Sequence, residues 1–160
     1  MTTASSEQLI DLARHPMTHW TGPIGLPDFS VLREEDFGPV FDSALAAHSA
    51  EIEAIANAAD APTIDNTLAA LELSGAALDH VSSIFWLRAG AHTNPAIQAF
   101  EREIAPKMSR HYSAIGMNAL LFARIDALYQ RRDELGLDGE TRRVLELTWK
   151  GFVKSGARLD

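Results

Sequence analysis

The chain of 160 residues contains no cysteine, which excludes disulfide bonds and thiolate zinc sites and fits a reducing compartment. It also lacks any apolar run near the ~20 residues that a membrane-spanning helix needs. Its amino terminus lacks the basic and apolar regions of a signal peptide. We therefore expect a cytoplasmic protein without membrane contact.

Basic side chains are scarce in the first half of the chain. Residues 1–80 hold 2 basic and 13 acidic side chains, whereas residues 81–160 hold 12 basic and 9 acidic ones. The net charge of −8 opposes strong attraction to phosphate, so nucleic-acid binding is disfavoured. The asymmetry leaves two interpretations open: complementary solvated faces, or a basic part that faces a missing domain or the anionic ends of a substrate.

Strict β-strand alternation is also missing, and apolar residues recur instead at helical spacing. The first expected helix spans residues 34–59, with Pro39 in its first turn. The second spans residues 64–85, with Thr63 as its N-cap. Gly75 lies on the apolar face of the second helix, which indicates the close approach of a neighbouring helix.

Capping and stop residues delimit three further helices. These helices begin at Asn94, Asn118 and Asp138 and end near Gly116, Gly136 and Gly156. Pro106 lies inside the first of them, where the lost backbone hydrogen bond predicts a kink or a break. In the same helix, Glu103 and Lys107 have the spacing of an exposed ion pair.

Together these elements predict an all-α fold, an antiparallel array of about five long helices. We expect residues 1–33 to form a short helix at Ser6–His15 and a lead-in rich in proline and glycine. Residues 34–160 are expected to form one helical domain. Long helices joined by short turns are typical of the wall of a large helical enzyme.

Catalytic constellations are absent as well. The sequence has no Gly-rich phosphate loop, no Gly-x-Ser-x-Gly motif and no His-Glu-x-x-His pentapeptide. His15 and His19 are four residues apart, but Pro16 suppresses the helix that would bring them together on zinc. His48 interrupts an apolar stripe, which is typical of a hydrogen-bonded core histidine. The other histidines lack ligand spacing: His80, His92 and His111.

The acidic pairs have no nucleophile or metal site beside them in the sequence and indicate solvated faces. These pairs are Glu34–Glu35, Glu51–Glu53 and Glu101–Glu103. We therefore expect the chain to contain no catalytic, cofactor-binding or metal-binding residue.

A series of short motifs runs through the chain from residue 61 to residue 157. They read APTIDNTL at 61–68, LSG at 73–75, EIAPKM at 103–108, LFARI at 121–125, LY at 128–129 and FVKSGA at 152–157. In order and spacing they resemble the amino-terminal region of the thimet oligopeptidase family of zinc peptidases. Within that family the closest branch is that of the bacterial dipeptidyl carboxypeptidases.

The resemblance implies a division of labour. In this family a zinc ion, bound by a His-Glu-x-x-His helix and a later glutamate, acts on short peptides in a deep channel between two helical lobes. The chain would be an amino-terminal fragment that forms a wall of this channel without catalysing the reaction. Its partners would be the missing catalytic domain of the same polypeptide and oligopeptide substrates, which lose C-terminal dipeptides. Zinc would be the cofactor of the full-length enzyme alone.

A stand-alone helical interaction or regulatory module is the alternative from a different functional class. Under the first interpretation, a wall segment separated from its enzyme exposes apolar positions that the rest would cover. We therefore also expect self-association, either through Ser6–Trp20 or through the fifth helix with Trp149 and Phe152.

Overall fold

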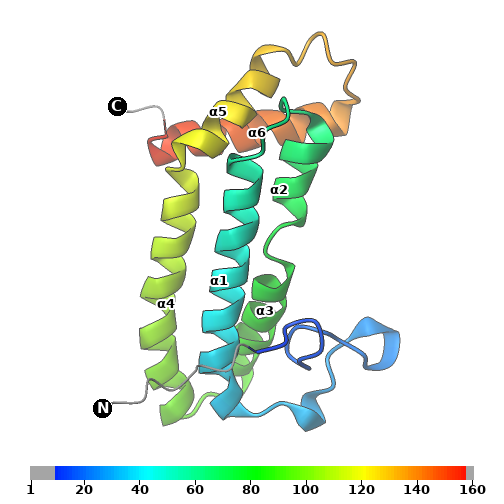
Figure 1. Cartoon of the computed structure of the whole chain (residues 1–160). Helices are drawn as coiled ribbons and strands as arrows, with labels where there is room; N and C mark the ends of the chain where they lie inside the picture. The colour runs from blue at the N-terminus through cyan, green and yellow to red at the C-terminus, as the bar shows by residue number, and fades with distance from the viewer. Residues whose placement is uncertain (1–9, 158–160) are drawn as a thin grey trace, which may run out of the picture. The chain divides into compact units, whose positions relative to one another are not determined.

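The computed structural model describes residues 10–157, and every regular element in this part is a helix. The expected all-α class is thereby confirmed (Figure 1). The longest elements of the described part are α1 (Phe37–Ala56), α3 (Ala76–Ala91), α4 (Pro95–Gly116), α5 (Ala119–Gln130) and α6 (Gly139–Ser155). None of the described helices is long and apolar enough to cross a membrane.

The chain divides into two compact units that interleave along the sequence. Unit 1 combines the residues up to His48 with Gly75–Glu101, and unit 2 combines Ser49–Ser74 with the residues from Arg102 onward. Helices α1 and α4 contribute to both units, α3 lies in unit 1, and α5 and α6 lie in unit 2. The predicted domains 1–33 and 34–160 stay a prediction.

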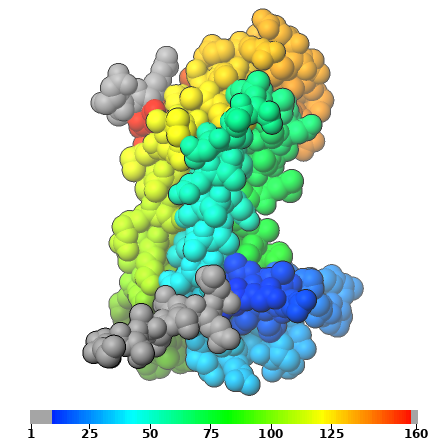
Figure 2. Space-filling view, viewed as in Figure 1, coloured from blue at the N-terminus to red at the C-terminus, as the bar shows by residue number. Residues whose placement is uncertain are grey.

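Short turns make up the lead-in of unit 1. Three 3-10 turns, Pro23–Gly25, Phe29–Val31 and Glu34–Asp36, precede the first long helix. The lead-in is the blue part of the space-filling view (Figure 2). Residues 10–15 form a turn and not the end of the helix expected at Ser6–His15, whose first residues lie outside the described part.

Helix α1 begins slightly later than predicted. Residues 34–36 form a 3-10 turn, and the α-helix starts at Phe37 and ends at Ala56. Pro39 is therefore in the first turn, as predicted, where its missing N–H needs no helical acceptor.

Four phenylalanines form the aromatic core of unit 1. The ring centroid of Phe85 on α3 lies 5.2 Å from Phe37, 5.8 Å from Phe41 and 5.2 Å from Phe100, each time edge to face. Such pairs add about 0.5–1.5 kcal/mol beyond simple burial. Phe37, Phe41 and Phe85 are almost fully buried, as expected for apolar residues that recur at helical spacing.

The prediction of a single helix over residues 64–85 is wrong. Thr63 is the N-cap, as expected, and accepts a hydrogen bond from the backbone N–H of Asn66 at 3.0 Å. The helix begins with a π-helical stretch, Ile64–Ala69, continues as α2 (Ala70–Leu73) and then stops. Ser74 is extended, and α3 begins only after Gly75, whose φ of +77° lies in the left-handed region.

His48 explains why Gly75 occupies this break. A Cβ at position 75 would lie 2.8 Å from Cε1 of His48, closer than side chains pack. His48 is itself buried. The close approach predicted at Gly75 is therefore confirmed, but the approaching group is an imidazole and the glycine also ends a helix, because only glycine adopts this φ without strain.

Helix α4 runs without a break through Pro106. Asn94 caps it as predicted, with its side-chain oxygen accepting the N–H of Ile97 at 2.9 Å. The predicted pair of Glu103 and Lys107 is also present, at 3.0 Å.

Unit 2 is built on α5 and α6, and their predicted caps are confirmed. The side chains of Asn118 and Asp138 accept backbone N–H groups of the first turn, and Gly156 ends α6 in the left-handed conformation. Helix α5 ends at Gln130, however, and not at Gly136, because the N–H of Arg131 bonds the carbonyl of Leu128 and tightens the last turn. The fully buried side chains of this unit include Leu121, Ile125, Leu128 and Leu145.

Candidate functional site

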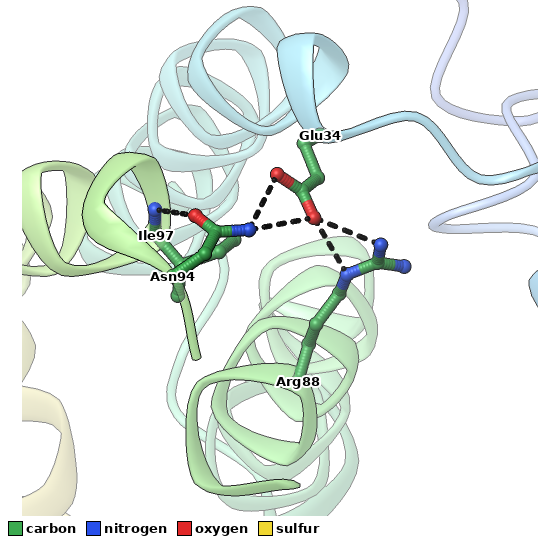
Figure 3. A network of polar contacts seen from close by, with 4 residues as sticks. All are labelled: Glu34, Arg88, Asn94 and Ile97. Carbon is green, nitrogen blue, oxygen red and sulfur yellow. Dashed lines mark hydrogen bonds and ion pairs between the residues drawn. The ribbon is translucent and has the colours of Figure 1, made fainter. Parts of the chain in front are cut away.

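A polar network in unit 1 joins three segments that are far apart in the sequence (Figure 3). The guanidinium of Arg88 on α3 donates to Oε1 of Glu34 from Nε at 3.1 Å and from Nη2 at 2.8 Å. Nδ2 of Asn94 donates to the same carboxylate at 3.3 and 3.2 Å. Since Asn94 also caps α4, one glutamate ties the turn before α1 to the end of α3 and the start of α4.

These donors hold the Glu34 carboxyl in its ionised form. The hydrogen bond from Asn94 and then the bond and charge of Arg88 lower the pKa of Glu34 below its ordinary value, while partial burial opposes them. A carboxylate with three donor groups on it is a poor proton donor near neutral pH. The network therefore suits the fixing of backbone segments better than acid–base chemistry.

An open hollow of ≈ 360 Å³ lies beside this network in unit 1. Its lining residues are Phe29, Leu87, Arg88, Ala91 and His92. Phe29 is 47% exposed and Leu87 is 58% exposed, so both present apolar surface to solvent. A hollow with apolar walls and one paired cation is suited to holding an apolar group.

The histidines are spread over the described part. His15 and His19 lie in the turns of the lead-in and not in an α-helix, as the proline between them predicts. His80 donates from Nδ1 to the carbonyl of Thr18 at 2.7 Å and stacks on Trp20 at 4.3 Å. His92 is exposed at the end of α3.

His111 in unit 2 lies near a serine hydroxyl. The distance from its Nδ1 to Oγ of Ser49 is 3.5 Å, beside a hollow of ≈ 120 Å³. This distance exceeds that of an effective O–H···N hydrogen bond, so the pair does not have the geometry of an activated nucleophile. Over residues 10–157, no group of three His, Asp or Glu side chains is arranged to hold a metal ion.

Arg124 in unit 2 is a feature that the sequence prediction missed. Its side chain is buried, and Nη1 donates to the carbonyls of Ala58 and Asp60 at 3.0 Å each, while Nη2 donates to Oδ1 of Asn66 at 3.0 Å. It thereby fixes the loop that leads into the helix capped by Thr63. The available signal was an arginine beside Leu121 and Ile125 on the apolar stripe of α5, because a charged residue on such a stripe needs buried partners.

Comparison with known proteins gives two relatives. The chain is 39% identical to a dipeptidyl carboxypeptidase of Salmonella typhimurium over 137 aligned residues, which make up 86% of this chain. It is 38% identical over 139 residues, or 87% of its length, to a dipeptidyl carboxypeptidase of Escherichia coli. The resemblance noted in the sequence is thereby confirmed. The chain spans 20% of the length of each relative, and no family model matches it.

Proposed function

We propose, on the premise that this chain is a relative of the bacterial dipeptidyl carboxypeptidases, that it is a non-catalytic part of a zinc-dependent peptidyl-dipeptidase. The complete enzyme would remove C-terminal dipeptides from short peptides. The chain would form a wall of the substrate channel and restrict access to it. The observation that carries this proposal is the identity of 38–39% over nearly the whole chain.

The side chains of the described part support a role without catalysis. Zinc in proteins needs at least three nitrogen, sulfur or carboxylate ligands around one point. Residues 10–157 offer no such group of His, Asp or Glu, and cysteine is absent from the sequence, so these residues do not fit a zinc ion. The metal of the complete enzyme would therefore be bound by residues outside this chain, in the catalytic domain that is its partner.

The helical construction supports the wall role in particular. The end of α3, the start of α4 and the turn before α1 are joined through Glu34, and the loop at 58–60 is joined to α5 through Arg124. Each unit thus has segments fixed by both apolar and polar contacts. A barrier that admits peptides and rejects folded proteins needs such fixed segments.

A chimera tests the proposal. The part of the Escherichia coli relative that matches this chain is replaced by residues 1–160, and the release of the C-terminal dipeptide from a blocked tetrapeptide is measured. We expect kcat/KM within about tenfold of the parent, because a change of wall leaves the catalytic groups in place and costs no more than ~1.4 kcal/mol of activation free energy.

Two controls accompany the chimera. One lacks the matching region altogether, and the other carries Gly75→Leu, which forces a side chain against His48. Both should lose activity. A folded chimera that is no more active than the deletion control would contradict the wall proposal and favour a stand-alone helical interaction module.

A further inference from the structure

The last two turns of helix α3 expose apolar residues as well as burying them. Its buried side carries Leu78, Val81, Ile84 and Phe85. In its last two turns the exposed positions are Trp86, Leu87, Gly90 and Ala91, and none of these has a polar side chain. Since positions 86 and 90, and likewise 87 and 91, are four residues apart, they form one continuous strip on the helix surface. We call this strip the outer face of α3.

A helix at a permanent protein surface normally carries charged or polar residues on its outer side. The outer face of α3 does not, although Trp86 is 40% exposed and Leu87 is 58% exposed. The earlier turns of α3 do carry polar residues at exposed positions, Asp79 and Ser83. The lack of polar residues on the outer face therefore indicates that a further segment covers the last two turns of the helix.

The hollow beside Leu87 continues this outer face. Leu87 and Ala91 belong to both, and the ring of Phe29 from the lead-in forms another wall. The space of ≈ 360 Å³ exceeds the volume of one large apolar side chain. The surface is thus a strip with an adjoining recess, which fits a helix or loop that inserts a side chain into it.

The charges of the hollow favour a neutral occupant. Arg88 is the permanent cation of its lining, and its Nε and Nη2 are bonded to Glu34. An acidic segment would therefore find the positive charge of Arg88 already neutralised. An apolar segment would bury the exposed parts of Phe29 and Leu87 without breaking this ion pair.

We propose that the outer face of α3 and its recess bind an apolar segment of the polypeptide that the relatives carry beyond the matched fifth of their length. This proposal rests on the proposed function, because it takes the occupant from the complete enzyme. The matched region is 86–87% of this chain but only 20% of each relative, so most of the relatives' residues lie outside it. That remainder is the source of the covering segment.

The test compares Leu87→Asp in two settings, the isolated chain and the chimera with the Escherichia coli relative. Gln98→Asp on α4 is the matched control, because it adds the same charge in unit 1 at an exposed polar position. The midpoint of thermal unfolding and the molar mass by light scattering are measured for each protein.

In the isolated chain, Leu87→Asp should lower the midpoint slightly more than Gln98→Asp, because an added carboxylate opposes the helix dipole near the end of α3 and complements it near the start of α4. This difference is the baseline. In the chimera, the difference between the two substitutions should exceed the baseline by several degrees, because Leu87→Asp places a charge in a covered apolar contact. If the chimera does not fold, the chain is co-expressed with the remaining part of the relative as a separate polypeptide. Leu87→Asp should then reduce co-purification of the two at least tenfold relative to Gln98→Asp.

The proposal would be overturned if the difference between the two substitutions were no larger in the chimera than in the isolated chain. It would also be overturned if the two polypeptides did not co-purify, or co-purified equally with either substitution. A dimer of both the isolated chain and the chimera that Leu87→Asp dissociates would overturn it too, because the occupant would then be a second copy. Dipeptide release separates this proposal from the proposed function. An inactive chimera that Leu87→Asp still destabilises more than the baseline counts against the peptidase role alone. An active chimera that Leu87→Asp does not destabilise in this way counts against the docking surface alone.

Discussion

At the scale of single residues, two charged side chains fix backbone segments by different means. Glu34 is an anion near the surface of unit 1, and its carboxylate accepts hydrogen bonds from Arg88 and Asn94. Arg124 is a buried cation in unit 2 that donates to neutral oxygen atoms of a loop. Removing the first leaves donors that water can reach, whereas removing the second eliminates three hydrogen bonds made by a buried guanidinium. The second loss should therefore be the larger.

Arg124→Met tests this expectation. The substitution keeps much of the apolar stem but removes three hydrogen bonds, so we expect the free energy of unfolding to fall by about 2–3 kcal/mol. Urea titration followed by circular dichroism measures it. Arg131→Met, at a side chain that is 60% exposed, is the control and should cost under about 0.5 kcal/mol. Equal losses would mean that Arg124 does not hold the loop.

The pH dependence of stability tests Glu34. Its pKa is lowered in the folded protein, so its contribution is complete at pH values above the ordinary glutamate value of 4.5. The contribution is lost as the pH falls from there through the folded pKa. The difference in unfolding free energy between the wild type and Glu34→Gln should therefore shrink on acidification. A difference that grows as the pH falls would show that the sign of the shift is wrong.

At the scale of elements, helix starts could be predicted from the sequence because their causes are local. The side chains of Thr63, Asn94, Asn118 and Asp138 each accept a hydrogen bond from the backbone N–H three residues ahead, so the chain itself carries the signal. The break at Gly75 depends on His48, which is distant in sequence. Nothing in the periodicity of residues 64–85 indicates that an imidazole fills the space beside position 75.

Gly75→Ala and Gly90→Ala should have opposite effects on stability. At Gly75 the left-handed φ and the nearby His48 ring should cost more than about 1 kcal/mol. At Gly90 in α3 no heavy atom other than the nearby backbone of the helix itself lies within 4 Å of an added Cβ, so alanine should raise stability by up to about 1 kcal/mol. Thermal unfolding measures both. His48→Ala added to Gly75→Ala should recover part of the stability lost in Gly75→Ala. If no stability were recovered, contact with the imidazole would not be a cause of the loss.

The apolar surface was also only partly predictable. The sequence analysis named the fifth helix, with Trp149 and Phe152, as a candidate surface for self-association, but Phe152 is 6% exposed in the core of unit 2. Trp149 stacks on Tyr129 at 4.2 Å. The outer face of α3 was overlooked because the stripe through Leu78, Val81 and Phe85 already accounted for one apolar side. A second apolar side becomes visible only when the exposure of each position is known.

At the scale of the whole molecule, the chain is a helical protein that matches a fifth of two peptidases. Its two units interleave along the sequence, since α1 and α4 contribute to both. A cut within the matched region would therefore divide at least one unit. The relation to a peptidase could be predicted from short motifs, whereas the wall role and its partner segment are proposals that need the complete enzyme.

The isolated chain should neither retain zinc nor hydrolyse peptides. Its described residues present no group of three His, Asp or Glu side chains for a metal ion. After dialysis, elemental analysis should give far less than one zinc per chain, and a blocked tetrapeptide should stay intact. Stoichiometric zinc, or peptide turnover that a chelator abolishes, would refute the assignment of the chemistry to residues outside the chain.

The way Arg124 is held constrains how this part of the sequence can diverge during evolution. Two of its acceptors are backbone carbonyls, at Ala58 and Asp60, which any residue supplies, so these positions can change without losing the bond. Asn66 is different, because it accepts through its side chain. Among homologues, substitutions at positions 58 and 60 should occur independently of the residue at position 124. Substitutions at positions 66 and 124 should occur together.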